Sequence, residues 1–221
     1  MHRKSVKETA AIVFGLLAIL VLGSAVADAQ PGPPVIGGGS GIVIDDKALC
    51  TVTTVGHDAQ GRLVGLTAGH CGGVGAAISA EADRGAGRIG HVAYTNPDLD
   101  YGIIEFEPGT IIPVNRIGNV TITGIGAPPD FPEVACKEGR TTGNTCGISW
   151  GDAQAGAQTW TQMCVVEGDS GSPVVVGTNL VGMVNAYLGV PCLGPEVGTN
   201  MSAIVADLNG RGVIGSGFRP I

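Results

Sequence analysis

Short runs of apolar and β-branched residues, separated by turns rich in Gly, Pro, Asn and Asp, recur along most of this chain. Runs of this kind occupy residues 42–44, 50–55, 63–67, 88–94, 100–106, 174–176, 180–184 and 201–205. Their length and composition are typical of β-strands. Residues 30–41 predict a linker and residues 72–87 a loop, while residues 204–208 fit either a turn of helix or another strand. The pattern therefore predicts an all-β domain with little helix.

The composition supports the same fold class. Of 221 residues, 38 are glycine, 14% are charged and 4% are aromatic, so helix-forming side chains are scarce. The length suits one sandwich or barrel domain, or two small barrels that share a core. The net charge of −7 argues against nucleic acid or an anionic membrane as a partner.

The first 29 residues differ in kind from the rest of the chain. Basic residues precede an apolar run over residues 10–22, and small residues follow it. This order is typical of a secretory signal peptide, with cleavage expected after Ala27 or, as the alternative, after Ala29. A retained membrane anchor is the competing interpretation, because the apolar stretch approaches the length of a spanning helix. We expect a signal peptide over residues 1–29 and a secreted protein; a retained segment would hold it at the cell envelope.

All the cysteines lie in the expected mature chain, and their even number in an exported protein predicts disulfides. A zinc site is the alternative, but the sequence contains no Cys-x-x-Cys pair, so we expect no metal and no cofactor. The spacing alone does not select a pairing. The cysteines are Cys50, Cys71, Cys136, Cys146, Cys164 and Cys192.

Residues 164–173, Cys-Val-Val-Glu-Gly-Asp-Ser-Gly-Ser-Pro, carry the strongest chemical signal. A serine hydroxyl is a poor nucleophile at its own pKa, so it needs a base beside it and N–H donors for the oxygen that becomes negative. Gly168 permits a sharp turn that directs its own N–H and that of Ser170 toward one point. An ordinary Gly-Asp-Ser-Gly turn is the alternative, and the rest of the chain decides between the two.

A histidine and an aspartate stand earlier in the chain in suitable places. His70 directly follows a predicted strand that ends in small residues, which let its imidazole approach a partner from elsewhere. Asp100 opens an apolar strand, a position that suits a buried carboxylate orienting a histidine, whereas Asp98 follows Pro97 in a turn and is expected to be solvated. The order His, Asp, Ser is that of chymotrypsin-like triads.

Each of these three residues also lies in a matching local string. Leu-Thr-Ala-Gly-His-Cys at 66–71, Asp-Tyr-Gly-Ile-Ile at 100–104 and Gly-Asp-Ser-Gly-Ser-Pro at 168–173 resemble the motifs of the trypsin-fold serine proteases. The resemblance is closest to the small secreted bacterial enzymes of the streptogrisin type, and it covers about residues 36–221.

The resemblance implies a fold and a role for each residue of the site. The fold is two perpendicular six-stranded antiparallel β-barrels, the first over about residues 36–115 and the second over about residues 116–221, with the active site in the cleft between them. Ser170 would attack the scissile carbonyl, His70 would transfer the proton, and Asp100 would orient the imidazole. The N–H groups of Gly168 and Ser170 would form the oxyanion hole.

The resemblance also implies the disulfide pairs Cys50–Cys71, Cys136–Cys146 and Cys164–Cys192. Met163, Asn185 and Tyr187 are the residues that it assigns to the substrate pocket.

Three positions depart from the family pattern. Ser172 replaces the usual second glycine after the nucleophile, and Asn185 replaces a serine near the triad carboxylate, where an amide can still donate. Tyr187 replaces a glycine on the wall of the primary specificity pocket.

Asp169 next to the nucleophile is expected to be buried, and a buried charge needs a partner. The resemblance offers two partners: an N-terminal amine released by cleavage before Ile36, or a basic side chain after the first cysteine of the 136–146 hairpin. That position is Lys137, with Arg140 close by, and we expect the internal pair of Asp169 with Lys137.

The hypothesis that follows is a secreted serine endopeptidase acting on peptide or protein substrates. A binding module of the same fold with weak or no catalysis, and an esterase for small acyl substrates, are the alternatives. We expect a monomer that protein protease inhibitors can bind, with no nucleic-acid partner and no membrane partner after signal cleavage.

Overall fold

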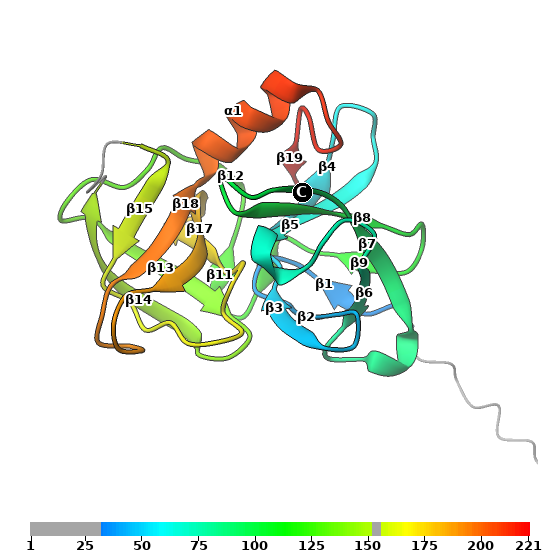
Figure 1. The fold of residues 1–221 in the computed structure, drawn as a ribbon, viewed down its shortest axis with the longest axis horizontal. Coiled ribbons are helices and arrows are strands. Elements are labelled where there is room, and N and C mark those ends of the chain that lie inside the picture. Colours follow the sequence, from blue (N-terminus) through cyan, green and yellow to red (C-terminus); the bar gives the residue numbers. More distant parts are fainter. Residues whose placement is uncertain (1–31, 152–155) are drawn as a thin grey trace, which may run out of the picture. The chain divides into compact units, whose positions relative to one another are not determined.

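A computed structural model describes residues 32–151 and 156–221. The predicted signal peptide lies outside the described residues. Within them the chain folds into two sheets that each curve into a barrel, drawn on the right and on the left of Figure 1. The prediction of an all-β fold built from two barrels is confirmed.

The first barrel is an eight-stranded sheet. In hydrogen-bonded order its strands are β19 (Arg219–Pro220), β4 (Thr54–His57), β5 (Leu63–Ala68), β8 (Tyr101–Phe106), β7 (Arg88–Asn96), β6 (Ala77–Ala80), β2 (Gly41–Ile44) and β3 (Ala48–Thr51). The edge strand β3 runs into β4 through residues 52–53, so the chain itself links the two sides of this half-barrel sheet without a further strand pairing.

The second barrel is a seven-stranded sheet. Its order is β12 (Gly124–Ile125), β17 (Asn179–Tyr187), β16 (Pro173–Val176), β13 (Val134–Gly139), β14 (Gly143–Gly151), β15 (Gln158–Thr161) and β18 (Glu196–Asn200). A further antiparallel pairing of β17 with β18 closes six of these strands into a ring.

The remaining elements connect and cover the barrels. β1 (Val35–Ile36) pairs in parallel with β9 (Ile112–Pro113), and β10 (Arg116–Ile117) pairs with β11 (Val120–Thr121). The helical elements are the 3-10 turns η1 (Gly69–Cys71) and η2 (Arg84–Ala86) and the helix α1 (Met201–Arg211).

Three local predictions were wrong. Residues 201–205 begin helix α1, because Met201, Ile204 and Leu208 recur at helical spacing and are all buried. The strand in this region is β18, just before the helix. Residues 72–87 are not all loop, since they contain the short strand β6, and the predicted linker contains β1.

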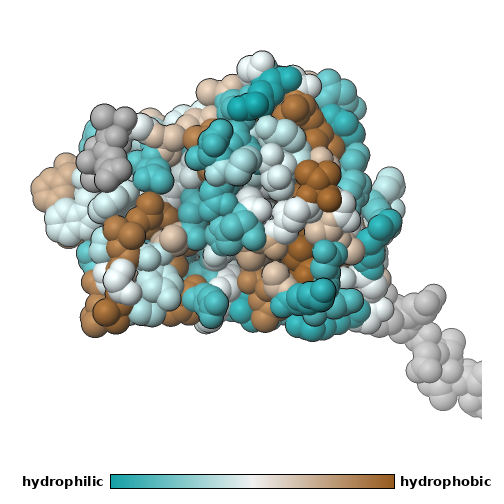
Figure 2. Space-filling model, viewed as in Figure 1, coloured by the Kyte–Doolittle hydropathy of each residue, from teal (hydrophilic) through white to brown (hydrophobic). Residues whose placement is uncertain are grey.

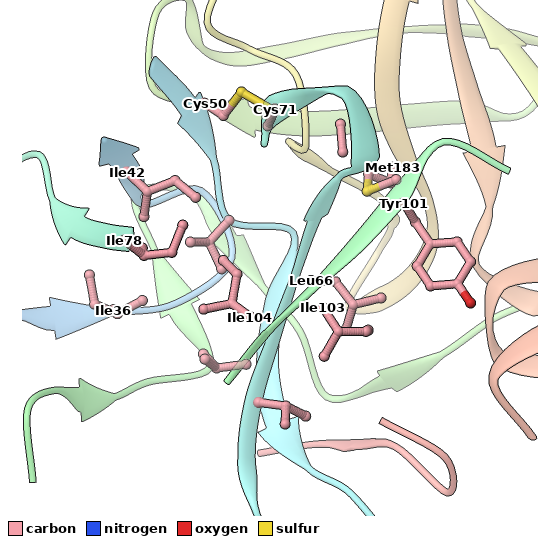
Figure 3. Close-up of a cluster of buried hydrophobic side chains, with 14 of the residues drawn as sticks. Ile36, Ile42, Cys50, Leu66, Cys71, Ile78, Tyr101, Ile103, Ile104 and Met183 are labelled. Carbon is pink, nitrogen blue, oxygen red and sulfur yellow. A yellow bond between two sulfur atoms is a disulfide. The ribbon is translucent and has the colours of Figure 1, made fainter. Parts of the chain in front are cut away.

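The apolar core is shared between the barrels and the helix. One buried cluster combines first-barrel residues such as Leu66 and Ile103 with Met183 of β17 and with Ile204 and Leu208 of α1. Figure 3 shows part of this cluster, with the Cys50–Cys71 disulfide at one end and the Tyr101 hydroxyl at the other. That hydroxyl donates to Asp207 of α1 at 2.7 Å, which ties the helix to the first barrel.

Polar and apolar side chains are mixed on the face of the molecule drawn in Figure 2, with apolar patches both at its lower left and at its upper right. The most exposed large apolar side chains of the second barrel are those of Leu193, Phe131, Val190 and Val134. Of the helices formed by the described residues, none has the length and apolar character needed to cross a membrane.

Candidate active site

His70 and Asp100 are brought together by the pairing of β5 with β8. Ala68, the last residue of β5, pairs with Tyr101, the first of β8, so the residues just beyond these strand ends meet. Gly69 allows the close approach: a Cβ at this position would lie 3.0 Å from the backbone of Tyr101. The His70 N–H then donates to Asp100 Oδ1 at 2.8 Å, which fixes the backbone of the histidine to the carboxylate.

Ser170 reaches the same place from the second barrel, in the loop between β15 and β16. His70 Nε2 lies 2.9 Å from Ser170 Oγ, and His70 Nδ1 lies 2.8 Å from Asp100 Oδ2. The structure therefore brings the three predicted residues into one continuous chain of hydrogen bonds. This is the geometry in which an imidazole can take the hydroxyl proton.

The pKa values of His70 and Asp100 are shifted in the directions that favour this proton transfer. The hydrogen bond to Asp100 raises the pKa of His70 above its usual range, outweighing the opposite effect of partial burial. Burial alone would raise the pKa of Asp100, but its bonds to His70 and to Asn185 lower it overall. The carboxylate stays ionised and stabilises an imidazolium.

Asn185, which we assigned to the substrate pocket but also expected near the triad carboxylate, lies behind that carboxylate. Its Nδ2 donates to the Asp100 backbone oxygen at 2.7 Å and to Oδ2 at 2.9 Å. A bulge in β17 between Val184 and Ala186 places Asn185 as an extra residue and redirects its side chain. Thr199 contacts the amide oxygen of Asn185 at 2.8 Å and so orients it.

The loop before the nucleophile is shaped by glycines and held by the first barrel. Gly168 has φ +93°, and a Cβ on it would lie 2.5 Å from side-chain atoms of Arg140 and Thr141. Thr51 donates its N–H to Ser170 O at 2.8 Å and its hydroxyl to Gly168 O at 3.0 Å. Within the described part of the chain, the N–H groups of Gly168 and Ser170 donate to no other group. Both remain available to an external oxygen.

Asp169 is fully buried beside this loop, and its environment differs in part from the expected one. Lys137 Nζ lies 3.7 Å from Asp169 Oδ2, with both side chains fully buried. The closest contacts, however, are hydrogen bonds from the hairpin turn: Oδ1 accepts from the N–H groups of Thr141 and Thr142 at 3.0 and 3.1 Å, and Oδ2 accepts from the Thr142 hydroxyl at 2.7 Å.

The other candidate partners of Asp169 are engaged elsewhere. Arg140 forms a two-pronged ion pair with Glu81 of the first barrel. Ile36 lies in β1, where its carbonyl accepts from Val114 at 2.9 Å, and its side chain is buried in the first-barrel core. Thr142 was missed by the sequence reasoning, because nothing in the string Gly-Arg-Thr-Thr-Gly signals a buried carboxylate across the barrel.

Glu196 is a second buried carboxyl group that the sequence did not reveal. Its side chain is 1% exposed; one oxygen accepts from the Thr161 hydroxyl, and the other has no hydrogen-bond partner in the described residues. Burial raises the pKa of Glu196 to about 8, and nearby Lys137 only partly opposes this. Glu196 is therefore mostly protonated at neutral pH.

The surroundings of the triad contain open space on two sides of His70. One hollow of about 470 Å³ lies against Ser170, Gly168, the Cys50–Cys71 bridge and Arg140. Another of about 470 Å³ lies against Thr95, Pro97 and Asp100. Met163 is buried in a small apolar cluster of the second barrel, and Tyr187 packs against the same cluster. Met163 thus lies inside the second barrel, and Tyr187 is half-buried against the cluster that contains it.

The cysteines form the bridges Cys50–Cys71, Cys136–Cys146 and Cys164–Cys192, which are the pairs that the resemblance implies. Cys71 follows His70, and Cys164 begins the nucleophile stretch, so two bridges brace the site. No group of three or more His, Cys, Asp or Glu side chains in residues 32–151 and 156–221 could hold a metal ion.

By sequence, the chain matches no protein-family model and no curated protein. Its structure is similar to solved bacterial proteases. Nocardiopsis protease aligns with a TM-score of 0.68 and 24% identity, covering 79% of this chain and 96% of its own. Thermobifida fusca Protease A aligns with a TM-score of 0.67 and 24% identity, covering 85% and 100%.

A chymotrypsin of Cellulomonas bogoriensis gives a TM-score of 0.63 at 24% identity and covers 84% of this chain and 98% of its own. At these identities the likeness establishes the fold. This chain has the fold of the bacterial chymotrypsin-like serine proteases.

Proposed function

We propose that this protein is a secreted serine endopeptidase that hydrolyses peptide bonds through an acyl-enzyme. The observation that carries the proposal is the hydrogen-bonded chain from Asp100 through His70 to Ser170, with distances of 2.8 and 2.9 Å. This chain lies beside two N–H groups that lack partners in the described residues. The combination supports an active enzyme over a binding module that has kept only the fold.

In the first half of the reaction, Ser170 Oγ attacks the carbonyl carbon of the substrate while His70 Nε2 takes the hydroxyl proton. The carbonyl oxygen becomes negative and accepts from the N–H groups of Gly168 and Ser170. His70 then donates its proton to the leaving amine, and the peptide bond breaks.

In the second half, a water molecule takes the place of the leaving amine. It loses a proton to His70 and attacks the acyl carbon, and the proton returns to Ser170 Oγ as the acid leaves. Throughout, Asp100 holds the imidazole through Nδ1 and stabilises its positive form, and Asn185 holds Asp100. No step requires a metal or a cofactor.

The space available beside Ser170 bears on the substrate. Tyr187 packs against the apolar cluster that contains Met163, and it replaces a glycine of the family pattern on the pocket wall, where a larger side chain leaves less room on the acyl side. This favours short or small acyl groups and keeps esterase activity on small acyl substrates as the second candidate. Hydrolysis rates for matched peptide and ester substrates distinguish the two.

The proposal is tested by replacing the nucleophile. Ser170→Ala is expected to abolish labelling by a fluorophosphonate and to lower kcat by on the order of 10⁶. Ser202→Ala, at an exposed serine in the first turn of α1, is the matched control and is expected to behave as wild type. Peptide cleavage by Ser170→Ala at the wild-type rate would disprove the role of Ser170. A folded wild-type protein that neither labels nor cleaves would instead support a binding module.

A further inference from the structure

The two N–H donors of the proposed oxyanion hole belong to two defined peptide planes. The Gly168 N–H shares its plane with the carbonyl of Glu167, and the Ser170 N–H shares its plane with the carbonyl of Asp169. In a planar trans peptide the N–H and C=O groups point in opposite directions. A group that holds either carbonyl from behind therefore sets the direction of the corresponding donor.

Each of these carbonyls accepts a hydrogen bond from a side-chain hydroxyl. Thr141 Oγ1 donates to Glu167 O at 2.9 Å, from the hairpin turn between β13 and β14. Ser172 Oγ donates to Asp169 O at 2.5 Å, and the Ser172 N–H donates to the same oxygen at 2.9 Å. Ser172 is fully buried and stands at one of the departures from the family pattern, where a glycine could not make the hydroxyl bond.

We propose that Thr141 and Ser172 are positioning residues of the oxyanion hole, acting through the carbonyls of Glu167 and Asp169. The inference rests on the proposed hydrolytic function. Neither hydroxyl touches the substrate. Each fixes a peptide plane so that its N–H faces the cleft before the oxyanion forms, and such preorganisation is what makes these donors effective.

A second contribution comes from polarisation along the hydrogen-bond chain. Arg140 Nη1 donates to Thr141 Oγ1 at 2.9 Å, and Arg140 is itself bound to Glu81. A hydroxyl that accepts from a guanidinium is a stronger donor to the next carbonyl, and a carbonyl that accepts strongly makes its own peptide N–H a stronger donor. The chain from Arg140 through Thr141 thus strengthens the Gly168 donor.

The two hydroxyls differ in how much depends on them. The Thr141 hydroxyl is the only group in the described residues that donates to Glu167 O. Asp169 O keeps the Ser172 N–H when the Ser172 hydroxyl is removed. Loss of the Thr141 hydroxyl is therefore expected to have the larger effect.

The test compares Thr141→Val, Thr141→Ser and Ser172→Ala with wild type, using the second-order rate of fluorophosphonate labelling. The phosphoryl oxygen of this reagent needs the same donors, and no substrate sequence has to be known. Thr141→Val is expected to label about tenfold more slowly and Ser172→Ala about threefold more slowly, a fraction of the 10²–10³ that follows removal of a whole donor. Thr141→Ser retains the hydroxyl and is expected to label near the wild-type rate.

The chain supplies a matched control. Thr145 donates its hydroxyl to Cys164 O at 3.0 Å from the same hairpin, but the N–H of that peptide belongs to Val165, outside the oxyanion hole. Thr145→Val is expected to label as wild type. The pH midpoint of labelling should be unchanged in all variants, because the surroundings of His70 are not altered.

A direct signature comes from a peptidyl trifluoromethyl ketone built on the best substrate of the wild-type enzyme and enriched with ¹³C at the ketone carbon. Its hemiketal with Ser170 places the oxyanion at the two N–H groups. The hemiketal pKa, followed by ¹³C NMR, is expected to rise in Thr141→Val and to stay at the wild-type value in Thr145→Val. An equal labelling rate and hemiketal pKa in Thr141→Val and wild type would overturn the inference.

Failure of the proposed function would look different. If folded wild-type protein is not labelled at all, Ser170 is not activated, and both the function and this inference fail. If wild type is labelled and Thr141→Val shifts the pH midpoint together with the rate, the substitution acts through His70, and only the inference fails.

Discussion

The amide of Asn185 joins the two barrels at the triad, donating from Nδ2 to the Asp100 carboxylate at 2.9 Å and to its backbone oxygen at 2.7 Å. Asp100 also has a φ of 47°, a left-handed conformation that is strained for a residue with a Cβ. The bonds from Asn185 help to hold the residue in this conformation.

Asn185→Ala is expected to lower kcat/KM by about 10- to 100-fold, because a hydrogen bond to a charged group contributes about 1.5–3 kcal/mol. Asn185→Asp would place a second negative charge against Asp100, so it should lower the rate further and move the pH midpoint of kcat/KM upward. Steady-state kinetics across pH provide the measurement. Equal profiles for Asn185→Ala and Asn185→Asp would exclude the contact as a source of the effect.

The pH dependence of activity should report the His70–Asp100 contact. Catalysis needs neutral His70, whose pKa is raised in the fold, so kcat/KM should rise with pH around a midpoint above the ordinary histidine value of about 6.5. Asp100→Asn removes the attraction that favours the imidazolium, so the midpoint should fall and kcat should drop by about 10⁴. Titration of the His70 ring by NMR in both proteins checks the shift, and an unchanged ring pKa would contradict it.

Glu196 predicts a stability change with pH that is independent of catalysis. Its pKa is about 8 in the fold and about 4.3 in an unfolded chain, so between these values the folded state binds the extra proton and stability falls as pH rises. The accumulated loss at neutral pH is on the order of 3 kcal/mol. Glu196→Gln should remove this slope and be more stable than wild type at pH 8. Urea unfolding at a series of pH values tests this, and parallel curves for the two proteins would disprove it.

The buried Asp169–Lys137 pair predicts how the chain becomes active. Lys137→Met is expected to destabilise the fold by about 3 kcal/mol, because Asp169 loses its buried counter-charge and keeps only its hydrogen bonds. A form beginning at Gln30 should be active as it stands. A form beginning at Ile36 should be no more active and less stable, since it lacks the Pro34 carbonyl that accepts from Ile112 at 2.9 Å.

The outcome that would reverse this interpretation is also clear. If only the form that begins at Ile36 is active, and Lys137→Met does not harm it, then a new N-terminal amine is the partner of Asp169. Activity and unfolding free energy, measured on the forms beginning at Gln30 and at Ile36, each with and without Lys137→Met, separate the two mechanisms.

Much of the fold and the members of the site could be predicted because their signals are local. The strings around His70, Asp100 and Ser170 each specify a short turn and a reactive group, and the alternating apolar runs specify strands. Helix α1 was predicted only as one of two alternatives over residues 204–208, because Ile204 and Val205 favour strands when taken alone, whereas packing selects the helical face.

The contacts that adjust the geometry and charge of the site were harder to predict from the sequence. Each of these contacts joins residues that lie 26 to 35 positions apart in the chain: Thr142 with Asp169, Thr141 with Glu167, and Thr161 with the buried Glu196. Threonine and glutamate are common surface residues, so their types carry no hint of such roles. Only the register of the barrel strands reveals them.

The return of the chain from the second barrel to the first has a consequence for the order of events during synthesis. Helix α1 contributes to the first-barrel core, and β19 pairs with β4 through Arg219 and His57. The barrel that carries His70 and Asp100 therefore lacks part of its core and one edge until residues 201–220 have left the ribosome. Protein synthesis adds about 5–20 residues per second, so these segments emerge several seconds after most of the chain has been made. The nascent polypeptide is thus expected to lack hydrolytic activity while it is still being made.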